Sequence, residues 1–233
     1  MAHDGQDMTM HSVILDDLIG LTGAALPPLD RLLEKATAAV RAQVSEGDRV
    51  SAKLIEANQT AAHGLAWLAT YVQARRQMQL WAERLQGDGR FGEVEQLLHQ
   101  IAFGEYLAQI RGGIQMNQGE MLRLQDLGLS AEDEATLDDP ALTTLTRSGN
   151  TQAARSRLVE LMQERSADVT FGVSGLDEEL EMIRDQFRRY AQEKVEPFAH
   201  DWHLKDELIP IEVIEELAEM GVFGLTIPEE FGG

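Results

Sequence analysis

Cysteine is absent from the 233-residue chain, so disulfide bonds and thiolate metal sites are excluded. That absence is compatible with a reducing cytoplasm. Long hydrophobic runs are also absent: the longest uncharged apolar stretch, GLAWLATYV from Gly64, is too short to span a bilayer. The first ten residues, MAHDGQDMTM, contain neither a basic region nor an apolar core, and we expect no export signal. Together these absences predict a soluble cytoplasmic protein.

Basic residues are scarce. The chain has 20 Lys and Arg against 40 Asp and Glu, for a formal net charge of -20. Binding to nucleic acid or to an anionic membrane surface requires a local excess of Lys and Arg, so we expect neither partner. The length allows one large domain or two small ones.

The fold class predicted by the apolar spacing is all-α, because helical periodicity recurs and no strand-like alternation persists. We expect a mobile N-terminal arm over residues 1–25 and a helical bundle over 26–128. An acidic connector with further helices should occupy 129–171, followed by a last helical segment over 172–233.

Local signals predict where individual helices begin and end. Pro27 and Pro28 suit the first turn of a helix. Asp48 is a candidate N-cap for one long helix over 48–86, and Gly112-Gly113 should end a second helix over 91–110. The short turn between these two helices predicts an antiparallel hairpin. Shorter helices are expected near 140–147 and 151–165.

The last segment also has clear punctuation. Ser174 and Asp177 have the spacing of a capping box. Pro197 should end or restart a helix, and Pro210 should open another helix at its first position. Gly221 is suited to the residue after the end of that helix.

The stretch IRDQFRRYAQEKVEPFAHDWHLKDELIPIEVIEELAEMGVFGLTIPEEFGG resembles the N-terminal helical domain of the acyl-CoA dehydrogenases. The resemblance rests on the order and spacing of short motifs, which are Ile183-Arg184, Phe187-Arg188, Val195-Glu196-Pro197, Ile209-Pro210, Leu217-Ala218-x-x-Gly221 and Gly224-Leu225-x-Ile227-Pro228-Glu229-Glu230-Phe231-Gly232-Gly233. Many members have Tyr at the position of Phe231. The match covers only about the last quarter of the chain, and in the family the Gly-Gly pair leads into further helices. We therefore expect an incomplete domain that belongs to a longer polypeptide.

The resemblance implies a flavoenzyme. Family members use FAD and a carboxylate base to dehydrogenate the α,β-bond of an acyl-CoA thioester, and they pass electrons to an electron-transfer flavoprotein. Many are homo-oligomers. In the family the base and most of the flavin contacts lie beyond the segment that matches this chain. We accordingly assign no catalytic, cofactor-binding or metal-binding residue within the 233 residues.

The residues before 172 resemble the N-terminal extension of one subgroup, the methylsuccinyl-CoA dehydrogenases, through AAHGLAWLATYVQARRQ and IAFGEYLAQIRGGI. Gln109, Gly112 and Gly113 also resemble a Gln-x-x-Gly-Gly segment that approaches FAD of a neighbouring subunit in the family's C-terminal domain. A duplicated hairpin with a flavin contact is one interpretation. The simpler one is that the two glycines end a helix.

Other candidate side chains favour structural roles. His200 and His203 lack a third metal ligand, and His63 and His99 stand singly in helices. Glu215 and Glu216 are expected on a solvated helix face. The helical spacing of three aromatic residues predicts a buried stripe: Trp67, Tyr71 and Trp81.

Two alternatives to an acyl-CoA dehydrogenase remain open. The first is a flavin monooxygenase or oxidase of the same fold, because the acid–base residues that distinguish these reactions are not in the matched segment. The second is a helical interaction or assembly module without catalysis.

Overall fold

The computed structural model describes residues 13–164 and 172–232. They divide into two compact units, unit 1 (Met1–Gly175) and unit 2 (Leu176–Gly233). Within the described residues, no helix is both long enough and apolar enough to cross a membrane. The two units are described separately below.

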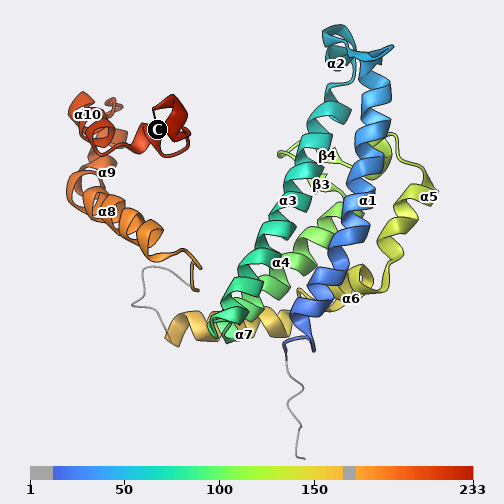
Figure 1. Ribbon diagram of the computed structural model, residues 1–233, viewed down its shortest axis with the longest axis horizontal. Helices are drawn as coiled ribbons and strands as arrows, with labels where there is room; N and C mark the ends of the chain where they lie inside the picture. Colours follow the sequence, from blue (N-terminus) through green and yellow to red (C-terminus); the bar gives the residue numbers. More distant parts are fainter. Residues whose placement is uncertain (1–12, 165–171, 233) are drawn as a thin grey trace, which may run out of the picture. The chain divides into compact units, whose positions relative to one another are not determined.

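Unit 1 is a helical bundle (Figure 1). Its helices are α1 (Leu18–Val44), α2 (Ala52–Ala57), α3 (Gln59–Gly87), α4 (Glu93–Gly112), α5 (Ala131–Glu134), α6 (Pro140–Ser148) and α7 (Gln152–Glu164). The long helices α1, α3 and α4 lie side by side, and α3 runs antiparallel to both neighbours (Figure 1). The predicted antiparallel hairpin of α3 and α4 is thereby confirmed.

Short elements complete unit 1. Two hairpins of two-residue strands pair β1 (Ser45–Glu46) with β2 (Arg49–Val50) and β3 (Ile114–Gln115) with β4 (Met121–Leu122). Two 3₁₀ turns, η1 (Leu124–Leu127) and η2 (Ala135–Asp138), connect the later helices. The predicted all-α class is confirmed, with these small hairpins as the β structure of the described residues.

The predicted start of the first helix at Pro27 is wrong. Helix α1 begins at Leu18, so both prolines lie inside it. An interior proline removes a backbone hydrogen bond and costs about 3 kcal/mol in an isolated helix. Leu18 and Ala25 are buried upstream of the prolines, and packing against α3 extends the helix through them. Of the predicted mobile arm, residues 1–12 lie outside the described residues.

The predicted single helix over 48–86 is also wrong. Asp48 lies in the β1–β2 turn, and Ser51 precedes α2 instead. Asn58 then separates α2 from α3, with φ -124° and ψ 36°. Its side-chain Nδ2 donates a hydrogen bond to the Leu54 carbonyl at 2.9 Å, which ties the break to the last turn of α2. Such local side-chain bonds compete with helix continuation.

Three later boundaries are confirmed. Helix α4 ends at Gly112, and α6 and α7 occupy the predicted positions near 140–147 and 151–165. Asp139 caps α6: its carboxylate accepts hydrogen bonds from the backbone N–H groups of Ala141 at 2.9 Å and Leu142 at 3.4 Å. Pro140 occupies the first turn, where its missing N–H costs nothing.

The core of unit 1 consists of apolar side chains from α1, α3, α4, α6 and the connecting turns. Its largest fully buried members are Phe103, Leu29, Leu32, Leu68, Leu85, Leu97, Leu107, Ile110, Ile114, Leu122, Leu127 and Leu142. Full burial of one such side chain contributes about 1.5–3 kcal/mol. Unit 1 therefore has a hydrophobic core of its own.

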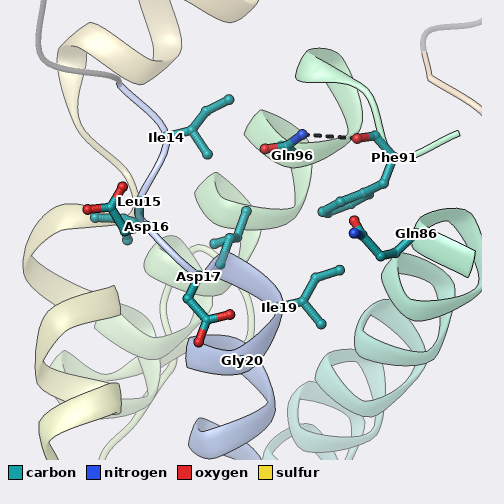
Figure 2. Close-up of a pocket in the computed structure, with 10 residues that line it drawn as sticks. Ile14, Leu15, Asp16, Asp17, Ile19, Gly20, Gln86, Phe91 and Gln96 are labelled. Carbon is teal, nitrogen blue, oxygen red and sulfur yellow. Dashed lines mark hydrogen bonds between the residues drawn. The ribbon is translucent and has the colours of Figure 1, made fainter. Parts of the chain in front are cut away.

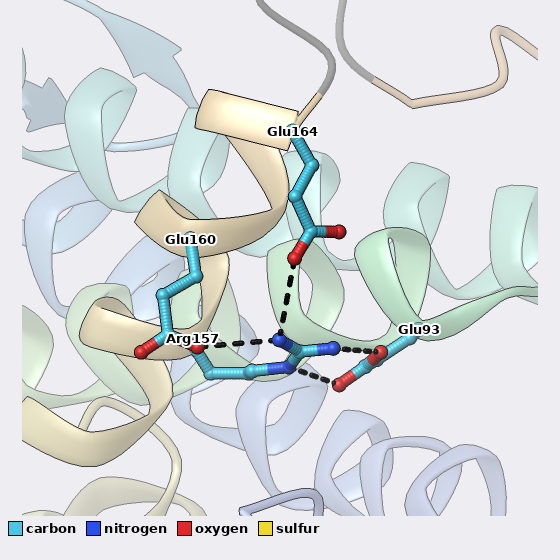
Figure 3. A network of polar contacts seen from close by, with 4 residues as sticks. All are labelled: Glu93, Arg157, Glu160 and Glu164. Atoms are coloured by element: carbon cyan, nitrogen blue, oxygen red, sulfur yellow. Dashed lines mark hydrogen bonds and ion pairs between the residues drawn. The ribbon is translucent and has the colours of Figure 1, made fainter.

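Helix α7 is held to α4 by an ion-pair network (Figure 3). The Arg157 guanidinium donates through Nε and Nη2 to the two carboxylate oxygens of Glu93, at 2.7 and 2.9 Å. Its Nη1 also faces Glu160 at 3.2 Å and Glu164 at 4.0 Å. The Arg157 hydrogen bond lowers the pKa of Glu93, and the carboxylates raise the pKa of Arg157. The pair joins two helices that are distant in sequence.

Unit 2 contains α8 (Glu178–Lys194), α9 (Glu196–Leu204) and α10 (Ile211–Glu219), followed by η3 (Val222–Gly224) and η4 (Glu229–Phe231). The predicted capping box at Ser174 is wrong, because Asp177 caps α8 itself by accepting from the Leu180 N–H at 2.9 Å. Pro197 lies in the first turn of α9, and Gly221 follows α10 with φ +80°, both as predicted. Pro210 is the N-cap of α10, one residue before the predicted position.

Unit 2 has no buried residue within Leu176–Gly232, the part that the structure describes. Large apolar side chains are exposed along all of its helices: Leu176, Leu180, Met182, Phe198, Leu204, Leu208, Ile209, Ile211, Phe223, Leu225, Ile227 and Phe231. Leu208 is 91% exposed. Contiguous exposed apolar surface of this kind marks a surface that packs against something else. Unit 2 has helices but no hydrophobic core.

Candidate functional site

The Gly112-Gly113 pair converts helix α4 into the β3–β4 hairpin. The Gly113 N–H donates to the Gln109 carbonyl at 2.7 Å, and its φ is +130°, a conformation that favours glycine. A Cβ atom at Gly113 would lie 2.6 Å from the Met121 sulfur, whereas one at Gly112 would meet nothing within 4 Å. Helix termination and the tight hairpin therefore account for Gly113.

The Gln109 side chain has partners within the bundle. Its Oε1 accepts from the Tyr71 hydroxyl at 2.7 Å, and its Nε2 donates to Glu105 at 2.8 Å. Burial raises the pKa of Tyr71, and nearby Tyr106 adds to this. The Oε1 end of the amide thus connects α4 to α3, and its Nε2 end is bonded within α4.

No group of His, Asp and Glu side chains with the geometry of a metal site occurs in residues 13–164 or 172–232. His200 and His203 are both exposed on α9. His63 is exposed on α3, and its Nε2 accepts a hydrogen bond from the Trp67 indole at 3.1 Å. His200 and His203 have the exposed positions that were expected, whereas His63 is more exposed than a packed or half-exposed residue.

His99 is fully buried in unit 1. Its Nε2 lies 2.9 Å from the Thr22 hydroxyl, which also lies 2.7 Å from Gln79 Oε1. The ring contacts Phe103 with centroids 4.8 Å apart. Burial, and secondarily the charge of Arg75, lowers the pKa of His99 to about 4. The ring is therefore neutral near pH 7, and its burial excludes contact with a substrate.

Arg75 is a buried cation of this region that the sequence analysis did not single out. It is 3% exposed, and its guanidinium carbon lies 4.1 Å from the ring centroid of Tyr106 and 5.4 Å from that of Phe103. Its Nη1 donates to the Ala102 carbonyl. Burial lowers its pKa to about 10, so the group stays cationic at neutral pH. Aromatic faces stabilise the charge by cation–π attraction.

The aromatic residues of α3 pack as a stripe. Tyr71 is buried and Trp67 and Trp81 are half-buried. Trp67 contacts Tyr71 edge to face with centroids 6.1 Å apart, and Tyr71 contacts Tyr106 at 4.6 Å.

In unit 2, Glu215 is exposed, and Glu216 lies 3.4 Å from Lys194 in an ion pair. Both predictions, an aromatic packing stripe and a solvated acidic face, are in line with this arrangement.

A hollow of about 580 Å³ lies beside the start of α1 (Figure 2). The side chains drawn around it are those of Ile14, Leu15, Asp16, Asp17, Leu18, Ile19, Gln86, Phe91 and Gln96, with Gly20 on α1. Buried Gln100 positions its wall by accepting from the Leu15 N–H at 2.7 Å and donating to the Val13 carbonyl at 3.0 Å. The lining offers carboxylates and amides but no cation and no histidine. The ionisable side chains of its described lining are thus the two carboxylates Asp16 and Asp17.

Unit 2 contains a second hollow, of about 380 Å³, between α9 and α10. It is lined by Val195, Ala199, Trp202, His203, Glu207, Ile209, Val213, Ile214 and Leu217. Apolar side chains dominate this lining. In the absence of buried residues around it, the hollow is part of the exposed apolar surface of unit 2 rather than an enclosed site.

Gly113 and the two hollows described above do not fit the pyrophosphate of FAD. A pyrophosphate cradle needs free backbone N–H groups beside a hollow, and the N–H of Gly113 is already hydrogen-bonded. Neither hollow described above combines glycine N–H groups with cationic side chains. We therefore find no pyrophosphate-binding site for FAD at Gly113 or in these two hollows.

The family model described as "Acyl-CoA dehydrogenase, N-terminal domain" matches residues 177–233. Residues 177–233 are therefore similar to the N-terminal domain of the acyl-CoA dehydrogenases, and we call them the acyl-CoA dehydrogenase segment. The match begins one residue after the start of unit 2, so the acyl-CoA dehydrogenase segment and unit 2 nearly coincide.

Individual relatives differ in how much of the chain they match. A glutaryl-CoA dehydrogenase of Desulfococcus multivorans is 36% identical over 25% of the chain. A mitochondrial isobutyryl-CoA dehydrogenase of Dictyostelium discoideum is 39% identical, also over 25%. The (2S)-methylsuccinyl-CoA dehydrogenase of Cereibacter sphaeroides is 58% identical over 94% of the chain. The match to this last relative includes unit 1 as well as unit 2.

The chain spans 39% of the length of the methylsuccinyl-CoA dehydrogenase, 15% of the glutaryl-CoA dehydrogenase and 14% of the isobutyryl-CoA dehydrogenase. The chain thus spans less than half the length of each of these relatives.

Proposed function

We propose that this chain is the N-terminal part of an FAD-dependent acyl-CoA dehydrogenase. The full enzyme would introduce an α,β-double bond into a short branched acyl-CoA, with (2S)-methylsuccinyl-CoA as the substrate. The observation that carries the proposal is the 58% identity to a (2S)-methylsuccinyl-CoA dehydrogenase, because it extends over 94% of the chain. Electron-transfer flavoprotein would accept the electrons. A cytoplasmic homo-oligomer is part of the same proposal.

The burial pattern of both units favours a structural rather than a catalytic role for this chain. Unit 2 has exposed apolar faces and no buried residue between Leu176 and Gly232, which suits helices that pack into a larger domain. Unit 1 has its own core, and its buried His99 and Arg75 are inaccessible to a substrate. The catalytic base and the FAD contacts would come from residues beyond position 233.

The test of the substrate is a comparison of three thioesters with the complete enzyme. We expect kcat/KM for (2S)-methylsuccinyl-CoA to exceed the values for glutaryl-CoA and isobutyryl-CoA, the substrates in the names of the other relatives. A higher value for either of those two would contradict the proposed substrate. Oxygen-dependent turnover without an electron acceptor would favour the alternative of a same-fold oxidase.

Unit 1 is proposed to act in assembly. Its own hydrophobic core, and the burial of His99 and Arg75 within it, favour this role over catalysis. Deleting residues 1–166 from the complete enzyme should change its oligomeric state or its kinetics, measured by light scattering and steady-state assays. Unchanged assembly together with unchanged kinetics would refute a role for unit 1 in either.

A further inference from the structure

The four residues that precede unit 2 are docked on the surface of unit 1 formed by α3 and α4. Both polar groups of the Val173 backbone have side-chain partners there. The Val173 N–H donates to Glu95 Oε1 at 2.9 Å, and the Val173 carbonyl accepts from Trp81 Nε1 at 2.9 Å. The backbone N–H and the carbonyl of one residue are thus bound by side chains of two different helices.

Glycines on both sides of Val173 fit the chain closely to this surface. Gly172 and Gly175 have φ values of +80° and +71°, which disfavour any side chain. A Cβ atom at Gly172 would lie 3.1 Å from Leu98, and one at Gly175 would lie 3.1 Å from Trp81 and 3.5 Å from Leu85. The path of residues 172–175 is therefore set by backbone conformation and by contact with the same two helices.

The Glu95 carboxylate on α4 is well placed to accept a hydrogen bond from a backbone N–H group. Glu95 is 4% exposed and lies in the first turn of α4, where the helix dipole stabilises a carboxylate. Gly92, the N-cap, leaves room for it: a Cβ atom there would lie 2.9 Å from Glu95 Oε2. The donor on α3 is equally well placed, because Trp81 packs edge to face on Phe91 with centroids 6.1 Å apart.

We propose that Trp81 and Glu95 form a docking site for residues 172–175, and that this site fixes the point where the chain leaves unit 1. Its function is to shorten the tether of the acyl-CoA dehydrogenase segment. Helix α7 ends at Glu164 and the docked segment ends at Gly175, 175 − 164 = 11 residues later. Eleven extended residues reach about 40 Å, so undocking greatly enlarges the volume open to unit 2. A shorter tether raises the effective concentration of a linked segment.

The inference does not depend on the proposed catalytic activity, because every contact lies within unit 1. It can therefore be tested with the 233-residue chain by amide hydrogen exchange at Val173, followed by NMR. Glu95→Leu removes the acceptor and Trp81→Phe removes the donor while keeping an aromatic ring. Either change should accelerate exchange at Val173 by about tenfold or more, the effect of losing one hydrogen bond.

Two conservative variants serve as matched controls. Glu95→Gln keeps an acceptor oxygen, and Trp67→Phe makes the same aromatic change at an indole that donates to His63 instead. Both should leave Val173 exchange within about twofold of the unmodified chain, well short of a lost hydrogen bond. Circular dichroism checks that the helices persist. Unaccelerated exchange in a folded Trp81→Phe chain would overturn the docking site, and so would equal acceleration in Trp67→Phe.

The tether role has a separate test. Because the chain has no cysteine, spin labels can be placed uniquely at Cys introduced for Glu34 on α1 and Glu212 on α10. The distribution of label distances should broaden in Trp81→Phe and stay unchanged in Glu95→Gln. Identical distributions in all three chains would show that docking does not restrict the tether.

Discussion

Gly104 on α4 offers a sharp test of how closely the bundle is packed. A Cβ atom at this position would lie 2.5 Å from the backbone nitrogen of Asn150 and 2.9 Å from the carbonyl carbon of Gly149. These neighbours are backbone atoms in the turn between α6 and α7, so they cannot turn aside as a flexible side chain would. Gly104→Ala should therefore push α4 away from this turn.

The magnitude follows from two opposing effects. Replacing a helical glycine by alanine stabilises the helix by about 1 kcal/mol. Overpacking a well-filled interior costs about 1–3 kcal/mol, and contact with backbone favours the upper end. We expect a net loss of about 1–2 kcal/mol in the free energy of unfolding. For a unit of this size, that loss lowers Tm by roughly 3–8 °C.

The assay is urea unfolding followed by circular dichroism. Gly112→Ala is the matched control, because it lies in the same helix and its Cβ would meet nothing within 4 Å. This control should be neutral or stabilising by up to about 1 kcal/mol. If Gly104→Ala were as stable as the unmodified chain, the close approach of α4 to the α6–α7 turn would be refuted.

Three further predictions concern the buried histidine, the α7 clamp and the two units. Because burial lowers the pKa of His99 to about 4, the unfolded chain binds a proton between about pH 6.5 and 4 that the native chain does not. The free energy of unfolding should therefore fall as the pH drops through this window, by at most about 3 kcal/mol. In urea titrations at pH 7 and 4.5, His99→Gln should show a smaller difference in unfolding free energy between the two pH values. An equal difference in the variant and the unmodified chain would contradict this prediction. Arg157→Ala should speed amide exchange in α7 at low salt, with a smaller difference at 1 M salt because screening weakens exposed ion pairs; a salt-independent effect would exclude an electrostatic clamp. Residues 1–175 alone should unfold cooperatively, whereas residues 176–233 alone should show no cooperative transition by calorimetry; a sharp transition in the second fragment would contradict its lack of a core.

Boundaries marked by local chemistry could be predicted from the sequence. Gly113 ends α4 because a positive φ is needed there, and Asp139-Pro140 opens α6 because a carboxylate cap and a proline suit a first turn. These signals act over a few residues and do not depend on distant packing. For that reason the sequence alone predicted the end of α4 and the start of α6.

Boundaries set by tertiary packing could not be predicted. The extension of α1 upstream through Pro27 and Pro28 depends on burial of Leu18 and Ala25 in the bundle. The break at Asn58 interrupts an apolar stripe that continues on both sides, so periodicity alone indicated one helix. At Pro27 and Pro28 a contact distant in sequence outweighed the local preference, whereas at Asn58 a local side-chain hydrogen bond to the Leu54 carbonyl accompanies the break.

The candidate site was predicted in outline only. The sequence anticipated the structural role of Gly113, which ends α4. It did not indicate Arg75, since arginine is rarely buried and the aromatic rings that hold it lie on another helix. The pair Phe103 and Tyr106, spaced for one face of α4, was the available signal for such a cation.

The most direct test of the central proposal compares the flavin absorbance of two purified proteins, the 233-residue chain and the longer polypeptide that would contain it. The account predicts a colourless 233-residue chain and a yellow longer protein whose flavin is bleached by (2S)-methylsuccinyl-CoA. A yellow 233-residue chain that oxidises the thioester would contradict it.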